Sequence, residues 1–189
     1  DARIGRKFLN AGVGFGGGCL PKDIRAFSAR AQELGLGSSV AFLEEVDVIN
    51  MRQRERVIQR VIADAGGDAS TIRVAVLGLA FKPHSDDVRD SPALDVAHGL
   101  IQAGADVVAY DPQANGPAHK RFPQLKLADT LEQVLVGADI AVLVTEWPEF
   151  VSLDPRTAGD LMAHQRIVDA RNVLDAEQWR AAGFHYSSL

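Results

Sequence analysis

Between residues 24 and 65 the apolar positions recur every three to four residues, the spacing of one face of an amphipathic helix. The first run comprises Ile24, Phe27, Ala31 and Leu34. Gly35 and Gly37 end this run, because glycine is favoured just after the last turn of a helix. Ser38 or Ser39 then offers a cap for a second helix of about 25 residues, which is long for a globular domain. Its apolar positions are Leu43, Val46, Ile49, Val57, Val61 and Ala65.

The pattern changes at residues 66–70, where the sequence Gly-Gly-Asp-Ala-Ser predicts a linker. Short runs that are apolar on both faces follow, and they predict strands over Arg73–Leu79, Val107–Tyr110, Ile140–Val144 and Ile167–Asp169. Helices are expected between them, one beginning at Ser91-Pro92 and one with a capping-box spacing from Asp129 to Glu132. Apolar strands that alternate with helices indicate a parallel sheet covered on both sides. The predicted fold class is α/β, with a helical segment over 1–68 and a Rossmann-like parallel-sheet domain over 69–189.

The end of the first strand bears on nucleotide binding. It carries Gly78-Leu79-Ala80-Phe81-Lys82, with only the first glycine of a dinucleotide fingerprint. This domain is therefore not expected to bind NAD in the standard way, although the crevice at the carboxyl ends of its strands remains the expected place for a nucleotide. Asp111 ends the second strand, where a ribose-binding acid is one interpretation. Pro112 and the incomplete fingerprint favour a turn-forming aspartate.

The single cysteine is the most distinctive chemical feature. Cys19 follows Gly16-Gly17-Gly18 and precedes Leu20-Pro21-Lys22-Asp23. Proline is preset for the first turn of a helix, so Cys19 is expected just outside a helix N-terminus, where the helix dipole and Lys22 favour a thiolate. The alternative is a small buried hydrophobe, but packing such a side chain does not require a glycine run. Asp23 is near enough to orient or deprotonate a water, and as a first-turn acid it also stabilises the helix dipole.

Composition excludes several classes of protein. The chain of 189 residues is 47% hydrophobic and 24% charged, as in an ordinary soluble globular protein, and its net charge of -5 argues against a nucleic-acid partner. One cysteine excludes an internal disulfide and fits the cytoplasm. No apolar run approaches the roughly 20 residues of a membrane span, so no membrane partner is expected. The five histidines lack metal-ligand spacing, and no metal site is predicted.

Several motifs together resemble the UDP-glucose 6-dehydrogenase family of nucleotide-sugar dehydrogenases, which also includes GDP-mannose enzymes. The matching segments are Arg3-Ile4-Gly5, Lys7-Phe8-Leu9, Gly14–Gly17, Cys19–Asp23, Gly78–Lys82, Asp87–Pro92, Tyr110-Asp111-Pro112 and Thr145-Glu146-Trp147. The opening Arg-Ile-Gly and the run over residues 12–18 resemble the UDP-glucose branch more than the GDP-mannose branch. Family members are much longer and begin with an NAD-binding domain. The chain is therefore interpreted as the C-terminal portion of such an enzyme, and by itself it is expected to be inactive.

The resemblance implies a reaction and two catalytic residues. Family members oxidise C6 of UDP-glucose to a carboxylate with two NAD and one water, giving UDP-glucuronate. Cys19 matches the nucleophile that forms a thiohemiacetal and then a thioester. Asp23 matches the residue that activates or orients the hydrolytic water. The helical segment matches the element that joins two domains and builds a homodimer.

The resemblance also implies a set of binding residues. The sugar nucleotide is expected to contact Arg3, Phe8, Leu9, Asn10, Gly12, Gly14, Phe15, Gly16, Phe81, Lys82 and Arg171. Lys22 and Arg89 match residues near the NAD. The glycines would let the loop backbone approach the ligand, Asn10 replaces a lysine found in some animal relatives, and Arg3 matches an arginine that reaches the neighbouring subunit's ligand.

Simpler roles remain open for several of these residues. Phe8 and Phe15 are equally explained as core aromatics, and Lys22 as a solvated surface lysine. Arg89 is equally explained by an ion pair with Asp86, Asp87 or Asp90.

Other functions also remain open. TDP-glucose or GDP-mannose are alternative substrates, and a non-catalytic nucleotide-sugar-binding or dimerisation module is an alternative of another class. A cysteine hydrolase is disfavoured, because no histidine lies near Cys19 in the sequence.

Overall fold

The structure, a computed structural model, describes residues 10–189 and contains a six-stranded parallel sheet. The strands are β1 (Arg73–Leu77), β2 (Asp106–Tyr110), β3 (Lys126–Leu127), β4 (Ile140–Leu143), β5 (Arg166–Asp169) and β6 (His185–Ser188). Their order is β3-β2-β1-β4-β5-β6, and every neighbouring pair is parallel. This is the strand order of doubly wound dinucleotide-binding folds. The predicted α/β class is confirmed.

The central strands are apolar on both sides because both faces of the sheet are covered. Across the sheet, Val74 of β1 is paired with Val107 of β2 on one side and with Ile140 of β4 on the other. All three residues are buried. The chain reverses its direction of travel across the sheet between β1 and β4. In open α/β sheets the loops that leave the carboxyl ends of two such strands diverge, so this switch point is the general place for a ligand.

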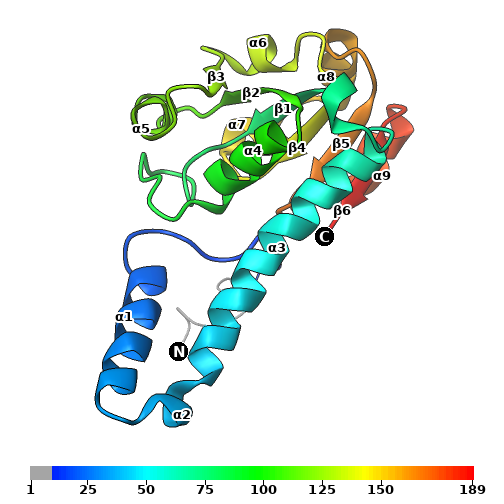
Figure 1. The fold of residues 1–189 in the computed structure, drawn as a ribbon. Coiled ribbons are helices and arrows are strands. Elements are labelled where there is room, and N and C mark those ends of the chain that lie inside the picture. Colours follow the sequence, from blue (N-terminus) through cyan, green and yellow to red (C-terminus); the bar gives the residue numbers. More distant parts are fainter. Residues whose placement is uncertain (1–9) are drawn as a thin grey trace.

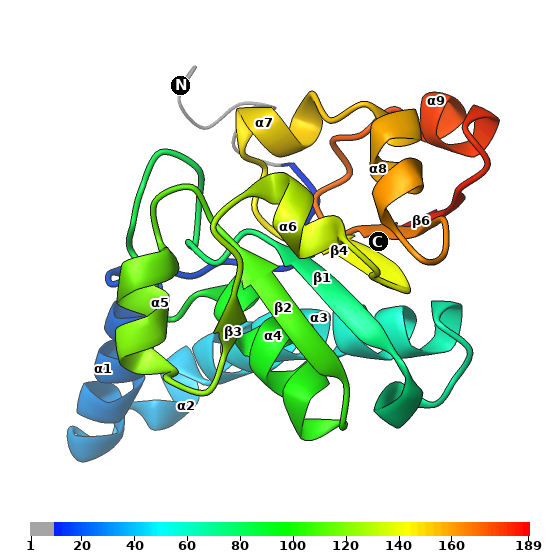
Figure 2. The same cartoon turned by 90° about the horizontal axis from the view of Figure 1, so that it is seen from above.

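The two faces of the sheet are covered by different helices (Figure 2). The helices of this domain are α4 (Pro92–Gln102), α5 (Asn115–Arg121), α6 (Leu131–Leu135), α7 (Pro148–Val151), α8 (Pro155–Leu161) and α9 (Ala176–Ala181). On one face α4 packs together with a long helix, α3 (Phe42–Asp64), and on the other α6 packs with α8. Gly99 of α4 allows the close approach to α3, because a Cβ at that position would collide with Ile58.

The helical segment forms an arm that extends beyond the sheet (Figure 1). It consists of α1 (Leu20–Glu33), α2 (Gly37–Val40) and the first half of α3. The second half of α3 buries Val57 and Val61 against the sheet domain, whereas Phe42 near its start is 64% exposed. In the part of the chain from residue 10 onward, no helix is long and apolar enough to cross a membrane.

Some local predictions need correction. Ser38 and Ser39 lie inside α2 and cap nothing, and α3 begins at Phe42 without a side-chain cap. The predicted box from Asp129 to Glu132 is displaced by one residue: Thr130 caps α6 by accepting from the Gln133 amide. The predicted cap at Ser91 is confirmed, with Pro92 in the first turn of α4.

Candidate functional site

The glycine-rich loop lies at the carboxyl edge of the sheet, against the segments that follow β1 and β5. The Gly17 amide donates to the carbonyl oxygen of Arg89 at 2.9 Å. A Cβ at Gly12 would lie 2.6 Å from Nη1 of Arg171, and one at Gly17 would lie 2.9 Å from the Phe81 ring. The loop that carries Cys19 is thus in contact with three of the predicted binding residues, which come from separate parts of the sequence.

The protein's own packing leaves little room for side chains at the glycines of this loop, most strictly at Gly16, where a Cβ would meet the backbone of Asp90. Added Cβ atoms would collide with Arg171 at Gly12, Asn50 at Gly14, the Asp90 carbonyl at Gly16, Phe81 at Gly17 and Arg89 at Gly18. Gly14 also has a φ of +100°, a conformation that residues with a Cβ rarely adopt. Packing therefore explains Gly14 and Gly16 without the expected close approach to a ligand, whereas Gly12 meets only the end of the Arg171 side chain.

Cys19 is the N-cap residue of α1 and is exposed. Its carbonyl oxygen accepts from the Asp23 amide at 2.9 Å, and Pro21 lies in the first turn, as the sequence predicts. A thiol at this place can be reached from solvent and lies at the positive end of the helix dipole. The alternative interpretation, a small buried side chain, does not describe it.

Lys22 and Asp23 are in the first turn of α1. Their side chains form an ion pair of 3.2 Å and are both exposed, so the pair is weakly held in the geometry of the protein alone. Asp23 is a carboxylate one helical turn from Cys19. A carboxylate and a thiol one helical turn apart are groups that can serve acid–base and nucleophilic chemistry.

Arg89 extends beside the cysteine loop and pairs with Asp87. Its Nη2 lies 2.7 Å from Oδ2 of Asp87, and its guanidinium packs against Gly18, the residue before Cys19. Hydrogen bonding to Arg89 lowers the pKa of Asp87 below its usual range, and the same contact raises the pKa of Arg89. Among the three aspartates considered from the sequence, Asp87 is the ion-pair partner.

Phe81 and Lys82 lie just beyond the carboxyl end of β1. The Phe81 amide donates to the Asp87 carbonyl at 3.1 Å, which closes the loop between β1 and α4. The Lys82 ammonium lies 5.4 Å from the centroid of the Phe81 ring, within cation–π range. A cation and an aromatic ring are therefore presented together at the switch point of the sheet.

Arg171 follows β5 and is held by Glu146, a residue to which the sequence analysis gave no role. Nη2 of Arg171 donates to Oε1 of Glu146 at 2.8 Å, and Nε lies 2.8 Å from Oε2. Glu146 belongs to the Thr145-Glu146-Trp147 motif at the end of β4. The motif could have pointed to Glu146, but its partner Arg171 lies 25 residues further along the sequence.

Asp111 forms the hydrogen-bonded turn that was preferred for it. Its carboxylate is 1% exposed and accepts from the amides of Leu79, Ala80, Gln113 and Ala114 and from the indole N–H of Trp147. With these donors in place, the carboxylate has no capacity to bind a ribose. Together with the incomplete fingerprint after β1, this means that the described residues do not fit NAD in the standard Rossmann manner.

Two polar residues of α3, Asn50 and Arg54, hold the loop and were missed. The Phe15 amide donates to Oδ1 of Asn50 at 2.8 Å, and Nδ2 of Asn50 donates back to the Phe15 carbonyl at 3.0 Å. Nη2 of Arg54 donates to the same carbonyl at 3.0 Å. Their spacing along the helix could have identified them, because positions 50 and 54 continue the buried face of Val57 and Val61 toward the start of α3.

The remaining predicted residues can be placed only in part. Arg3, Phe8 and Leu9 lie outside the described residues, and Asn10 is exposed at their border. Phe15 is half-buried. Over residues 10–189, no three His, Cys, Asp or Glu side chains gather as metal ligands would.

Comparison with known families agrees with this geometry. Residues 75–176 match the UDP-binding domain of the UDP-glucose/GDP-mannose dehydrogenase family, and residues 1–52 match the central domain of the same family. The chain belongs to this family. Cys19 lies in the part matched to the central domain, and Lys82, Arg89 and Arg171 lie in the part matched to the UDP-binding domain. The site is thus built from both.

Individual family members extend this result. A UDP-glucose 6-dehydrogenase of Rhizobium meliloti is 40% identical over 100% of this chain, which spans 43% of that protein. A UDP-glucose dehydrogenase structure from Pyrobaculum islandicum superposes with a TM-score of 0.82 at 33% identity, over 99% of this chain and 40% of that one. A UDP-D-ManNAc dehydrogenase structure from Pyrococcus horikoshii matches with a TM-score of 0.71 at 30% identity, over 94% of this chain and 39% of that one. The chain therefore spans less than half the length of these relatives.

Proposed function

We propose that this chain is the part of an NAD-dependent UDP-glucose 6-dehydrogenase that contains its nucleophile and much of its sugar-nucleotide site. The observation that carries the proposal is the placement of Cys19. It is an exposed thiol at a helix N-terminus, on a loop packed against Phe81, Arg89 and Arg171 at the switch point of a Rossmann-like sheet. The proposed nucleophile and two arginines therefore lie together at the edge of the sheet where a ligand is expected.

The proposed chemistry begins when C6 of the sugar has reached the aldehyde level. The Cys19 thiolate adds to the aldehyde carbon, a sulfur–carbon bond forms, and the carbonyl oxygen gains a proton to give a thiohemiacetal. Loss of a hydride from C6 and of that proton leaves a thioester. Water then adds to the thioester carbonyl, with Asp23 accepting the proton of the attacking water, and the sulfur–carbon bond breaks to release the carboxylate and the thiol.

NAD supplies the acceptor for the two hydrides. Because the described residues do not fit a standard dinucleotide site, we expect NAD to be held by another part of the enzyme. Lys22 and Arg89 are the contacts that this chain would contribute. The chain alone is accordingly expected to form no NADH.

The proposed UDP-glucose site uses Phe81, Lys82 and Arg171 from the sheet edge, together with the loop over residues 10–16. The backbone amides of Phe15 and Gly17 are already bonded, to Asn50 and to the Arg89 carbonyl. Other groups of the loop must therefore contact the ligand. Arg3, Phe8, Leu9 and Asn10 remain candidates on the resemblance alone.

The reaction is tested in the full-length protein by following NADH formation with UDP-glucose, TDP-glucose, GDP-mannose and a UDP-linked N-acetylated sugar. We expect two NADH per UDP-glucose, and near-complete loss of turnover in Cys19→Ser, because a serine hydroxyl is a far weaker nucleophile at neutral pH. Turnover with a UDP-linked N-acetylated sugar in place of UDP-glucose would move the protein to the specificity named for the Pyrococcus relative. Absence of NADH with every sugar nucleotide would favour a non-catalytic binding module.

A further inference from the structure

Asn50 and Arg54 are polar residues at buried positions of α3. They are 3% and 2% exposed, one helical turn apart, on the face that buries Val57 and Val61 further along the helix. Apolar side chains would bury here without desolvating an amide or a cation. Nε of Arg54 even lacks a hydrogen-bond partner within the described part of the chain. Polar residues at these positions therefore need a reason other than packing.

Both side chains converge on a single peptide segment, Phe15. Asn50 accepts from its amide and donates to its carbonyl, so it pairs with Phe15 as a neighbouring strand would, and Arg54 adds a second donor to that carbonyl. The close fit of Asn50 requires Gly14, where any Cβ would collide with the Asn50 amide. The contact is thus specific to the backbone of the loop.

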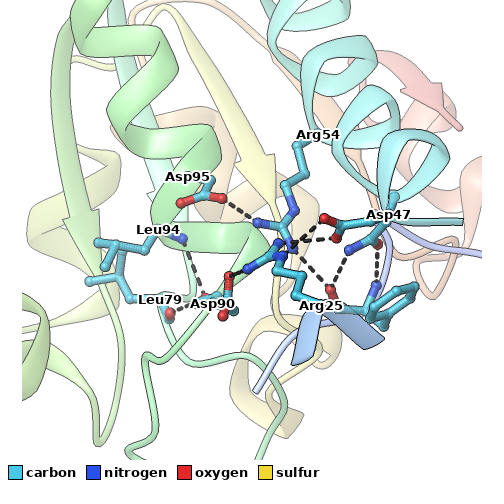
Figure 3. Close-up of polar contacts among 10 residues, drawn as sticks. Arg25, Asp47, Arg54, Leu79, Asp90, Leu94 and Asp95 are labelled. Carbon is cyan, nitrogen blue, oxygen red and sulfur yellow. Dashed lines mark hydrogen bonds and ion pairs between the residues drawn. The ribbon is translucent and has the colours of Figure 1, made fainter. Parts of the chain in front are cut away.

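Arg54 is itself fixed by the sheet domain. Its guanidinium pairs with Asp95 in the first turn of α4 (Figure 3). A second arginine, Arg25, links α1 to α3 and to the loop before α4 (Figure 3). Its Nε lies 2.9 Å from Oδ2 of Asp47, and its Nη1 lies 3.1 Å from Oδ1 of Asp90. These contacts raise the pKa of Arg25 further above its usual range.

The chain between these anchors is very short. Phe15 is held by α3, Gly17 by the Arg89 carbonyl, and Cys19 begins α1. Little freedom is left for the backbone that connects them. The position of the Cys19 sulfur is therefore coupled to the hydrogen bonds of Asn50 and Arg54, although neither residue contacts Cys19.

We propose that Asn50 and Arg54 are positioning residues that hold the Phe15 peptide and thereby place the Cys19 thiol for attack. The proposal deepens the function proposed above and rests on it for the identity of the reaction. The holding of the loop can be measured without substrate.

The test uses two variants and one matched control in the full-length protein. Asn50→Leu keeps the size of the side chain and removes both hydrogen bonds, and Arg54→Lys keeps the charge next to Asp95 while losing the donor to Phe15. Val57→Ala is the control, because it weakens the packing of α3 at a buried position away from the loop. Melting temperature, kcat, KM and hydrogen exchange of residues 13–19 are measured for all of them.

We expect kcat of Asn50→Leu to fall about 10- to 100-fold relative to Val57→Ala, with a smaller change in KM, because displacement of a reacting group by about 1 Å has effects of this size. Exchange of residues 13–19 is expected to accelerate at least about 10-fold in both loop variants, and to remain near wild type in the control. Loss of activity that merely follows the melting temperature, as in Val57→Ala, would overturn the proposal. So would unchanged exchange in an active enzyme.

The exchange measurement separates this proposal from the function on which it rests. If the wild-type protein forms no NADH but the loop variants accelerate exchange, the holding of the loop stands and the proposed reaction fails. If the wild-type protein is active and exchange does not respond, the reaction stands and the positioning role fails.

Discussion

At Gly14 two requirements coincide, a left-handed backbone and contact with the Asn50 amide. Gly14→Ala therefore adds conformational strain of about 1–2 kcal/mol and also displaces Asn50 from Phe15. We expect kcat to fall by about 10-fold or more, together with faster exchange of the loop.

Gly67→Ala is the matched control for this prediction. Gly67 has a similar φ of +93°, but nothing lies within 4 Å of the position its Cβ would take. This variant carries the strain without the collision, so it should lower the free energy of unfolding and leave kcat unchanged. Equal kcat values for the two variants would show that the contact with Asn50 is irrelevant to catalysis.

The ion pair of Asp87 and Arg89 predicts a dependence of stability on pH. Because Arg89 lowers the pKa of Asp87 in the folded state, the stabilisation is fully present above the unfolded-state value of about 3.9 and is lost as the pH falls through the lower folded value. The difference in unfolding free energy between wild type and Asp87→Asn should thus be small but constant from pH 7 to about 5, and shrink below about 4. It is measured by urea unfolding at a series of pH values. A difference that grows on acidification would contradict this assignment.

At the scale of elements, Ser91 ties the start of α4 to the loop after β1. Its hydroxyl donates to the Leu79 carbonyl at 2.6 Å and accepts from the Leu94 amide, and the residue is 1% exposed. Ser91→Ala removes the cap and leaves the buried carbonyl without this donor, so we expect a loss of about 1–2 kcal/mol in chemical denaturation. Ser152→Ala, at an exposed hydroxyl with only a long contact of 3.5 Å, should cost much less. Similar losses for both variants would argue against the cap.

The helices and strands predicted correctly from the sequence are those in which the local residue preferences agree with the burial imposed by the folded protein. The four buried strands are apolar on both faces because both faces are covered, and Ser91-Pro92 has the chemistry of a cap. The strands β3 and β6 were missed because they form the two edges of the sheet, where β3 has two residues and β6 contains His185, Ser187 and Ser188. Ser38 and Ser39 were wrongly predicted to cap α3, because the connection between α1 and α3 contains a short helix of its own, α2, and both serines lie inside it.

The candidate site was predictable where one short motif carries the chemistry. Cys19 at the helix start and Phe81 and Lys82 at the strand end were recognised from local sequence and resemblance, and the structure places them as expected in the fold. Asn50 and Glu146 were missed, since each acts on a partner 35 and 25 residues away. No local pattern specifies such a pair before the helices and the sheet are assembled.

At the scale of the whole molecule, the arm formed by α1, α2 and α3 presents an apolar surface. Its exposed large apolar side chains are Leu20, Phe27, Leu34, Leu36, Phe42, Val48, Ile49 and Met51. Exposed apolar side chains that gather in one patch mark an interaction site, and the arm extends away from the sheet domain (Figure 1). Such a surface would fit the homodimer that the resemblance implies, and we expect the arm to form part of its interface.

The expected homodimer yields the prediction with the widest consequence, tested by Phe42→Glu in the full-length protein. Phe42 is 64% exposed at the start of α3, and a buried carboxylate in an apolar interface is unfavourable, so we expect the sedimenting mass to fall by half at micromolar concentration. Val136→Glu is the control, because Val136 is similarly exposed, at 52%, but follows α6 on the sheet domain. Should Arg3 complete the neighbouring subunit's site, turnover of Phe42→Glu would recover as protein concentration rises, and Arg3→Ala would remain impaired at every concentration. If Phe42→Glu keeps the wild-type sedimenting mass, the start of α3 is not part of a dimer interface, and the arm gives no support to a site shared between subunits.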